Sequence, residues 1–159
     1  MHKQKTSTEI SGGFLIPKVG IELIYCICMI HINYKLDKSD NHGIGLFTNE
    51  DLESGQLVYT ASPLLDLNIT QAEFDSLDAA EQNEIRWWGF FDEPTQKWHV
   101  DFDVSKFINH SADATLTQDT SHSAAYLVTT RKVKKGEELT QNYLEFESME
   151  DLKRRDIAV

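Results

Sequence analysis

The sequence has little cysteine, proline, glycine and positive charge for its length. Its 159 residues include 2 cysteines, 3 prolines and 8 glycines, and 15 Lys and Arg residues stand against 26 Asp and Glu residues. So little glycine and proline argues against a collagenous or linker-like chain. Cys26 and Cys28 are too few for a disulfide framework, and without a second pair they are too few for a structural zinc site. We therefore predict that both thiols are buried in the core and that the protein holds no metal.

The deficit of positive charge and the lack of a long apolar run exclude two kinds of partner. The formal net charge of −11 repels phosphate backbones, so we expect no direct binding of nucleic acid. The apolar run from Leu23 to Ile30 is far shorter than the roughly 18 residues of a membrane span, and no signal-peptide cleavage site follows it. We expect a cytoplasmic protein without membrane contact, for which a basic peptide or protein is the electrostatically favoured partner.

The chain has enough apolar residues for one folded domain, since 40% of them are hydrophobic and 10% are aromatic. We predict a partly flexible N-terminal extension over residues 1–29, a folded domain over residues 30–147 and a C-terminal helical segment over residues 148–159. The extension starts with a polar stretch that ends in Gly12-Gly13, which is typical of a mobile arm.

Hydrophobic periodicity predicts a domain built mostly from short strands. Apolar and polar residues alternate from Ile30 to Leu36, which indicates a half-buried strand there. Apolar runs bounded by turn residues predict further strands around residues 43–47, 56–60, 87–91, 98–102, 126–130 and 137–143.

Helix signals are few. The capping-box spacings that begin at Thr70 and Asp78 predict one or two short helices between residues 70 and 88. Ser148 is expected to cap a last helix over residues 149–155. The fold class expected from these patterns is mainly β with a few short helices.

Taken singly, the motifs of the chain are weak. The glycines of Gly43-Ile44-Gly45 occur in many hairpins, and because they open no long helix they do not indicate a dinucleotide site. No serine lies in a nucleophile elbow, and the histidines show no zinc-hydrolase spacing. A lone tyrosine such as Tyr143 is usually a core residue with its hydroxyl bonded at the surface.

Taken in order, the same segments become specific. The chain reads SDNHGIGLFT over residues 39–48, DLESGQLV over 51–58, KFINHS over 106–111 and TRKVKKGEELTQNY over 130–143. This series resembles the SET-domain family of protein lysine methyltransferases. The family pattern is a Gly-x-Gly turn, an Arg-Phe-Ile-Asn-His-Ser segment and a Gly-Glu-Glu-Leu segment that ends in tyrosine. The resemblance runs from about Tyr34 to Phe146, so the expected folded domain is identified as a SET domain.

The resemblance implies a β-clip type of fold, made of small curved sheets with a C-terminal pseudoknot, and S-adenosylmethionine as the cofactor. It also implies that Tyr143 lies at the point of methyl transfer and is the catalytic residue. The cofactor-binding residues that it implies are Gly43, Ile44, Gly45, Asn109, His110, Tyr143 and Phe146. No metal is implied.

These residue types suit methyl transfer to lysine. The reaction needs a neutral amine held in line behind the methyl carbon, so positioning is the main task. Lysine begins charged, with an ordinary pKa near 10.4. A desolvated channel beside a cationic sulfonium disfavours the ammonium form. The Tyr143 hydroxyl is expected to orient the amine without acting as a strong base.

The chain departs from the family pattern at three places. Ala112-Asp113-Ala114-Thr115 follows Asn-His-Ser, where Cys-x-Pro-Asn is usual. The residue before Tyr143 is Asn142 instead of the frequent aspartate, and residues 144–159 contain no cysteine for the family's zinc segment. Something else must then cover the adenine and the channel mouth, and Phe146 and the final helix are the candidates.

The substrate is expected to be a lysine-bearing protein or peptide of basic character. Residues 66–101 hold nine acidic residues against two basic ones, a net charge of −7, in the region that the family uses to hold its substrate. The same charges are equally compatible with a solvated surface. Two alternatives stay open: a catalytically weakened SET-like binding module, and a methyltransferase that acts on a non-protein amine.

Overall fold

The computed structural model describes residues 29–157. Cys26, Cys28 and the expected extension up to residue 28 lie outside the described residues, so their burial and flexibility stay predictions. Among the helices of residues 29–157, none combines the length and the apolar character that crossing a membrane requires.

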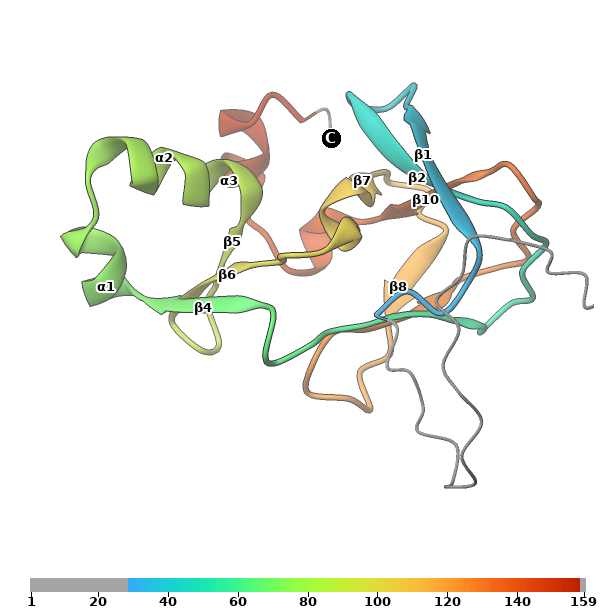
Figure 1. Ribbon diagram of the computed structural model, residues 1–159, viewed down its shortest axis with the longest axis horizontal. Coiled ribbons are helices and arrows are strands. Elements are labelled where there is room, and N and C mark those ends of the chain that lie inside the picture. The colour runs from blue at the N-terminus through green and yellow to red at the C-terminus, as the bar shows by residue number, and fades with distance from the viewer. Residues whose placement is uncertain (1–28, 158–159) are drawn as a thin grey trace, which may run out of the picture.

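Seven short strands form the larger sheet (Figure 1). Their hydrogen-bonded order is β1-β2-β10-β8-β9-β3, and β7 pairs with β10 beside this path. The strands are β1 (Tyr34–Lys38), β2 (Ile44–Thr48), β3 (Leu57–Thr60), β7 (Asn109–His110), β8 (Leu116–Gln118), β9 (Tyr126–Thr129) and β10 (Glu138–Gln141). A register shift between Leu57 and Tyr59 marks an irregularity in the pairing of β3 with β9, of the kind that bends a strand.

Strand β10 lies in the middle of this sheet. It runs antiparallel to β2 and parallel to both β7 and β8. A tight hairpin cannot join parallel neighbours, so β10 is inserted between segments that precede it in the chain. This is the interlocked arrangement that a C-terminal pseudoknot requires.

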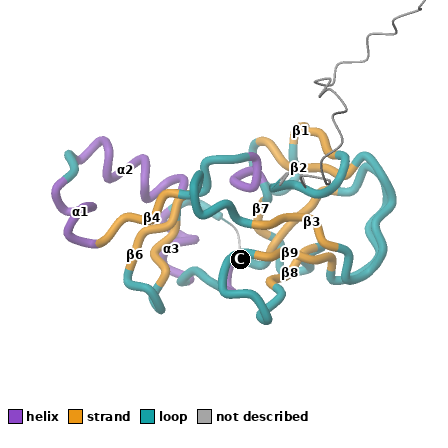
Figure 2. Tube along the Cα trace, turned by 60° about the horizontal axis from the view of Figure 1, so that its bottom comes forward, coloured by secondary structure: helices purple, strands orange, loops and turns teal. Residues whose placement is uncertain are grey.

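A smaller unit lies at the opposite end of the molecule from β1 and β2 (Figures 1 and 2). It consists of β4 (Leu67–Thr70), α1 (Gln71–Ser76), α2 (Ala79–Trp88), β5 (Phe90–Asp92) and β6 (Lys97–Val100), with the sheet order β4-β6-β5. Thr70 and Asp78 both form complete capping boxes, which confirms the two predicted helix starts. Phe74 is buried and stacks on Trp98 at a centroid distance of 4.6 Å, so α1 is anchored on the small sheet.

The remaining elements are short helices. They are the 3-10 helices η1 (Val104–Phe107) and η2 (Tyr143–Glu145) and the helix α3 (Met149–Arg154). The Ser148 side chain accepts a hydrogen bond from the backbone N–H of Asp151, which confirms the predicted cap of the last helix.

The predicted strand over residues 30–36 is wrong in its start, and its predicted burial holds at Ile30 and Ile32 but not at Tyr34 and Leu36. The regular strand begins at Tyr34, and all five of its residues are exposed because β1 is the edge of the sheet. Ile30 makes only an isolated bridge with Tyr59. The last predicted strand also ends early, at Gln141, and Tyr143 begins a 3-10 helix.

The boundaries predicted around the aromatic runs are wrong as well. Trp87 and Trp88 are the last residues of α2, since the helix that begins after Asp78 continues through them. Strand β6 ends at Val100, and Phe102 is 76% exposed. Aromatic residues favour strands only weakly, and a well-capped helix overrides that preference here.

One apolar cluster joins the strands of the larger sheet. It comprises Ile30, Ile32, Leu46, Leu52, Val58, Tyr59, Ile108, Leu116, Leu127, Val133 and Leu139. Leu139 of β10 and its cross-strand partner Leu46 of β2 are both completely buried. The core is therefore centred on the inserted strand.

We expect Leu139→Ala to lower the free energy of unfolding by about 2–5 kcal/mol, because truncation leaves a cavity in a fully packed site. Leu64→Ala is the matched control. Its side chain is 93% exposed, and the same truncation there should change stability by less than about 0.5 kcal/mol. Urea unfolding of the two variants measures the difference, and equal losses would contradict the central place of β10.

Candidate active site

Residues of both sheets line a single cavity of about 810 Å³. This volume lies within the range of sites for small molecules, roughly 300–1,000 Å³. Of the residues that the sequence singled out, Asn109, His110, Tyr143 and Phe146 line the cavity, whereas Gly43, Ile44 and Gly45 do not. Asn41 and His42, directly before those three residues, do line it.

Asn109 links the cavity to the turn before β2. Its Nδ2 donates to the carbonyl oxygens of His42 at 3.0 Å and Ile44 at 3.2 Å, and to Glu138 Oε1 at 2.8 Å. The other carboxylate oxygen of Glu138 accepts from Asn41 Nδ2 at 2.9 Å. The Asn109 carbonyl oxygen, Oδ1, accepts no hydrogen bond from the described residues. It is therefore free to accept one from a ligand in the cavity.

Gly45 leaves room for side chains of the protein itself. A Cβ atom at this position would clash with Glu138 Oε1 and would lie at a tight 3.2 Å from Asn109 Nδ2. The sequence analysis expected this glycine to allow close approach of a cofactor. The structure adds a reason inside the fold, because a side chain at Gly45 would displace the Glu138 carboxylate that holds Asn109.

His110 and Tyr143 are joined across the β7–β10 pair. The Tyr143 backbone N–H donates to His110 Nδ1 at 3.1 Å, so this ring nitrogen carries no proton. Burial lowers the pKa of His110, which keeps the imidazole neutral at neutral pH. His110 thus fixes the backbone at the start of η2, just where Tyr143 enters the cavity.

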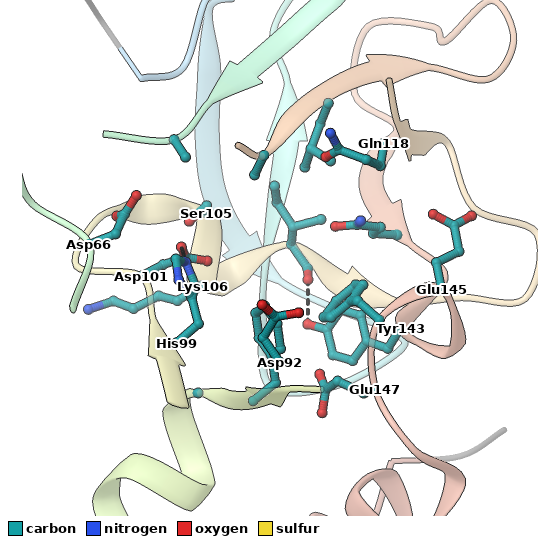
Figure 3. A pocket seen from close by; sticks show the side chains of 18 of the residues that line it. Asp66, Asp92, His99, Asp101, Ser105, Lys106, Gln118, Tyr143, Glu145 and Glu147 are labelled. Carbon is teal, nitrogen blue, oxygen red and sulfur yellow. Dashed lines mark hydrogen bonds and ion pairs between the residues drawn. The ribbon is translucent and has the colours of Figure 1, made fainter. Parts of the chain in front are cut away.

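The Tyr143 hydroxyl points into the cavity and donates to the carbonyl oxygen of Ile108 at 2.5 Å (Figure 3). Burial and, next, the charge of Glu147 raise its pKa, and Arg155 opposes them. The hydroxyl therefore stays protonated at neutral pH. Since its one proton is held by Ile108, its oxygen lone pairs remain for a ligand.

The segment after Tyr143 closes one side of the cavity. Phe146 packs against Tyr143 and Phe90, with ring centroids 5.4 Å and 4.8 Å away. Glu147 and Arg155 form an ion pair whose side chains are only 3% and 11% exposed. The Arg155 guanidinium lies 5.7 Å from the centroid of the Tyr143 ring. The start and the end of helix α3 are therefore tied to the catalytic candidate.

The loop that lacks proline is held by threonines instead. Thr115 is buried, and its hydroxyl accepts from the backbone N–H of Thr140 in β10 at 2.9 Å. The Thr130 hydroxyl donates to the carbonyl oxygen of Ala114 at 2.8 Å. Asn142, in place of aspartate, still caps η2 by accepting from the Leu144 backbone N–H. Both segments that depart from the family pattern are therefore held by hydrogen bonds within the protein.

Sequence reasoning missed several residues that line the cavity, namely Tyr59, Asp66, His99, Asp101, Ser105, Glu147 and Arg155. Asp66, His99 and Asp101 form a cluster whose polar atoms lie within 4.8 Å of one another. In Figure 3 these residues and Ser105 lie on one side of the cavity, and Tyr143, Glu145 and Glu147 lie on the other. No motif joins residues so far apart in the chain.

The arrangement suits positioning chemistry. The cavity offers a free amide oxygen on Asn109, a neutral imidazole on His110 and a protonated phenol on Tyr143. Such groups hold and orient a polar or cationic ligand without forming a covalent bond to it.

Comparisons with known proteins agree with this geometry. The SET domain family matches residues 43–144. A Polycomb Repressive Complex 2 of Chaetomium thermophilum with mutations in Ezh2 is similar over 77% of this chain, with a TM-score of 0.59 and 24% identity. The same complex bound to S-adenosylmethionine is similar over 79%, with a TM-score of 0.55 and 25% identity.

The Polycomb chains are much longer than this one, which spans 16% and 17% of their length. A proposed histone methyltransferase of Plasmodium falciparum is similar over 72% of this chain and 95% of its own length, with a TM-score of 0.51 and 14% identity. No curated protein matches the sequence significantly. The family match covers more than half of the chain and contains Asn109, His110 and Tyr143, and the chain therefore belongs to the SET domain family.

Proposed function

We propose that this chain transfers a methyl group from S-adenosylmethionine to the ε-amine of a lysine residue in a protein. The observation that carries the proposal is the Tyr143 hydroxyl, which is buried in the cavity, bonded to Ile108 and set beside His110. Membership of a family of methyltransferases supports the reaction class.

The residues present fit the cofactor. Asn109 Oδ1 is an unused acceptor at the cavity surface and would bind an ammonium group. Asn41, His42 and His110 would hold the other polar groups, and Phe146 offers an aromatic face. When bound, S-adenosylmethionine supplies a methyl group on a cationic sulfonium centre.

Tyr143 would orient the amine that receives the methyl group. Its proton is engaged with Ile108, so its oxygen accepts an N–H from a neutral amine and leaves the nitrogen lone pair free to form the new C–N bond. The carbon–sulfur bond breaks with its electron pair left on sulfur, and the product ammonium then loses a proton to solvent. Because the pKa of Tyr143 is raised, tyrosinate is not the base in this scheme.

Asn109→Ala should weaken cofactor binding by about ten- to a hundredfold. This loss corresponds to one hydrogen bond to a charged group, at about 1.5–3 kcal/mol. Titration calorimetry with S-adenosylmethionine, in the presence of a chelator, measures the affinity. Asn49→Ala is the matched control, because its exposed side chain makes no hydrogen bond to the described residues.

Asn109 also bonds to Glu138, so thermal unfolding of the variant must be recorded beside the titration. A folded variant with unchanged affinity would contradict the role of Asn109. Wild-type protein that binds no cofactor would contradict the whole proposal.

Tyr143→Phe should keep the fold and most of the cofactor affinity and lower kcat at least tenfold, or change how many methyl groups are added. Only the hydroxyl is removed, and its proposed partner is the amine. Mass spectrometry of a lysine peptide after incubation with labelled cofactor gives both readouts. Tyr34→Phe on the exposed edge strand is the control and should behave as wild type.

An effect of Tyr143→Phe below tenfold with the same product distribution would make Tyr143 an ordinary structural tyrosine. Cofactor binding without transfer to any peptide would favour a binding module instead. Transfer to small amines alone would favour a non-protein substrate.

The substrate is proposed to be basic. Among the described residues, six carboxylates line the cavity against three Lys or Arg side chains. The carboxylates are those of Asp66, Asp92, Asp101, Glu145, Glu147 and Asp156. Negative potential around a cavity attracts cationic peptides and weakens as salt screens it, over a length of about 8 Å at physiological ionic strength.

Asp92→Asn should reduce the preference for a basic over a neutral lysine peptide, and Glu93→Gln should not. Asp92 lines the main cavity, whereas its neighbour Glu93 lies at the hairpin tip and does not line it. The ratio of kcat/KM for the two peptides, followed across a salt series, is the measurement. A ratio that ignores salt and both substitutions would rule out electrostatic selection, while leaving methyl transfer untouched.

A further inference from the structure

The cavity has an acidic end that lies across from Tyr143 (Figure 3), and the proposed function uses its carboxylates only for their charge. Asp66 directly precedes β4, His99 lies within β6, and Asp101 follows β6 by one residue. One ligand-type atom of each lies within 4.8 Å of the others. The pairing of Leu67 with Val100 across β4 and β6 brings these residues together, so the cluster is part of the fold and not a chance meeting of exposed side chains.

His99 is oriented from both sides. Its Nδ1 lies 3.0 Å from Asn68 Oδ1, and its Nε2 lies 3.0 Å from Asp101 Oδ1. With the Nδ1 proton donated to the Asn68 carbonyl oxygen, Nε2 is left facing a carboxylate. Nε2 must then carry either a proton or a metal ion, and the carbonyl oxygen behind the imidazole can accept the ring N–H as the usual acceptors of a metal-bound histidine do.

Three buried oxygen atoms at this end have no hydrogen-bond partner in the described part of the chain. They are Asp66 Oδ1, Ser105 Oγ and the Tyr59 hydroxyl, and their residues are 8%, 7% and 1% exposed. Burial and then the charge of Asp101 raise the pKa of Tyr59, and its approach to the Ser105 hydroxyl opposes them, which places its hydroxyl within the field of the cluster. An unpaired buried carboxylate oxygen is costly, so Asp66 Oδ1 is an unused ligand atom of the cluster.

We propose that Asp66, His99 and Asp101 form a binding site for a divalent transition-metal ion of the zinc class. Zinc accepts one imidazole and two carboxylates as protein ligands and leaves a fourth position for water. At the tetrahedral angle, bonds of about 2.0–2.2 Å put two ligand atoms roughly 3.3–3.6 Å apart. His99 Nε2 and Asp101 Oδ1 lie 3.0 Å apart, and the ligand atoms of the whole cluster lie within 4.8 Å of one another. Binding would therefore require side-chain movements of about an ångström.

The bound ion would cross-link the start of β4 to the end of β6. Asp66 precedes β4, His99 lies in β6 and Asp101 follows it, so all three proposed ligands belong to the small sheet or flank it. The site lies across the cavity from Tyr143 (Figure 3). The ion would take no part in methyl transfer itself, but it would cancel part of the negative charge proposed to attract a basic substrate. The proposal places a metal in a chain whose ligand spacing predicted none.

An alkylammonium group is the alternative occupant. It could also bind Asp66 Oδ1 and the two hydroxyls, but it would not bind His99 Nε2, which faces the Asp101 carboxylate. A metal ion engages that nitrogen and must displace any proton on it. Proton release on binding therefore distinguishes the two occupants.

The test is calorimetric titration of the full, EDTA-treated and dialysed chain with zinc chloride alone. It should be run near pH 6.5 in two buffers of different ionisation enthalpy. We expect one saturable site, release of about one proton per ion and a higher melting temperature that excess chelator reverses. Asp66→Asn and His99→Gln should each weaken binding at least tenfold, and Asn68→Ala should weaken it about 10–100-fold.

The controls separate this site from others. Asp113→Asn and His122→Gln remove an exposed carboxylate and an exposed imidazole and should leave the affinity unchanged. Cys26→Ser/Cys28→Ser removes the thiols, which also bind zinc. Binding that disappears with the thiols, that survives both Asp66→Asn and His99→Gln in folded protein, or that methylammonium displaces without proton release would overturn the proposal.

Discussion

Strand β10 is hydrogen-bonded to three earlier strands, and the positions of Asn109, His110 and Tyr143 follow from this pairing. The parallel register sets Thr140 beside Asn109 and Gln141 beside His110. Tyr143 comes two residues later and meets the His110 ring through its own backbone N–H. The three residues that carry the proposed chemistry thus depend on one ladder, and packing of Leu139 against Leu46 secures it from below.

Side chains extend this constraint to the rest of the cavity wall. The Glu138 carboxylate joins Asn109 to Asn41, so that a residue of β10 organises two loops that precede it. Thr115 performs the same task on the other side, with its hydroxyl bonded to β10. Because Glu138 occupies the space beside Gly45, the absence of a side chain at Gly45 allows Glu138 to hold Asn109.

The sequence predicted what is local or what a motif records. Capping boxes at Thr70 and Asp78 need only four residues each, and both helix starts are confirmed. The motif segments led to Asn109, His110 and Tyr143, which meet in one cavity. Trp87 and Trp88 were assigned to a strand because aromatic pairs are frequent in strands, whereas the helix that begins at Ala79 extends through both of them. Asp66 and His99 were beyond reach, since their meeting depends on the β4–β6 register and on no spacing in the chain.

The central place of β10 also governs how the protein must be made. As the chain leaves the ribosome, β2 appears with only β1 as a neighbour, and its other edge stays open until Glu138 has been synthesised. The strands β7 and β8 also lack their parallel partner until β10 has been synthesised. Such non-local pairing slows folding and leaves unpaired edges that join other chains readily. The newly made protein therefore passes through a period of vulnerability to aggregation in which chaperones would determine its yield.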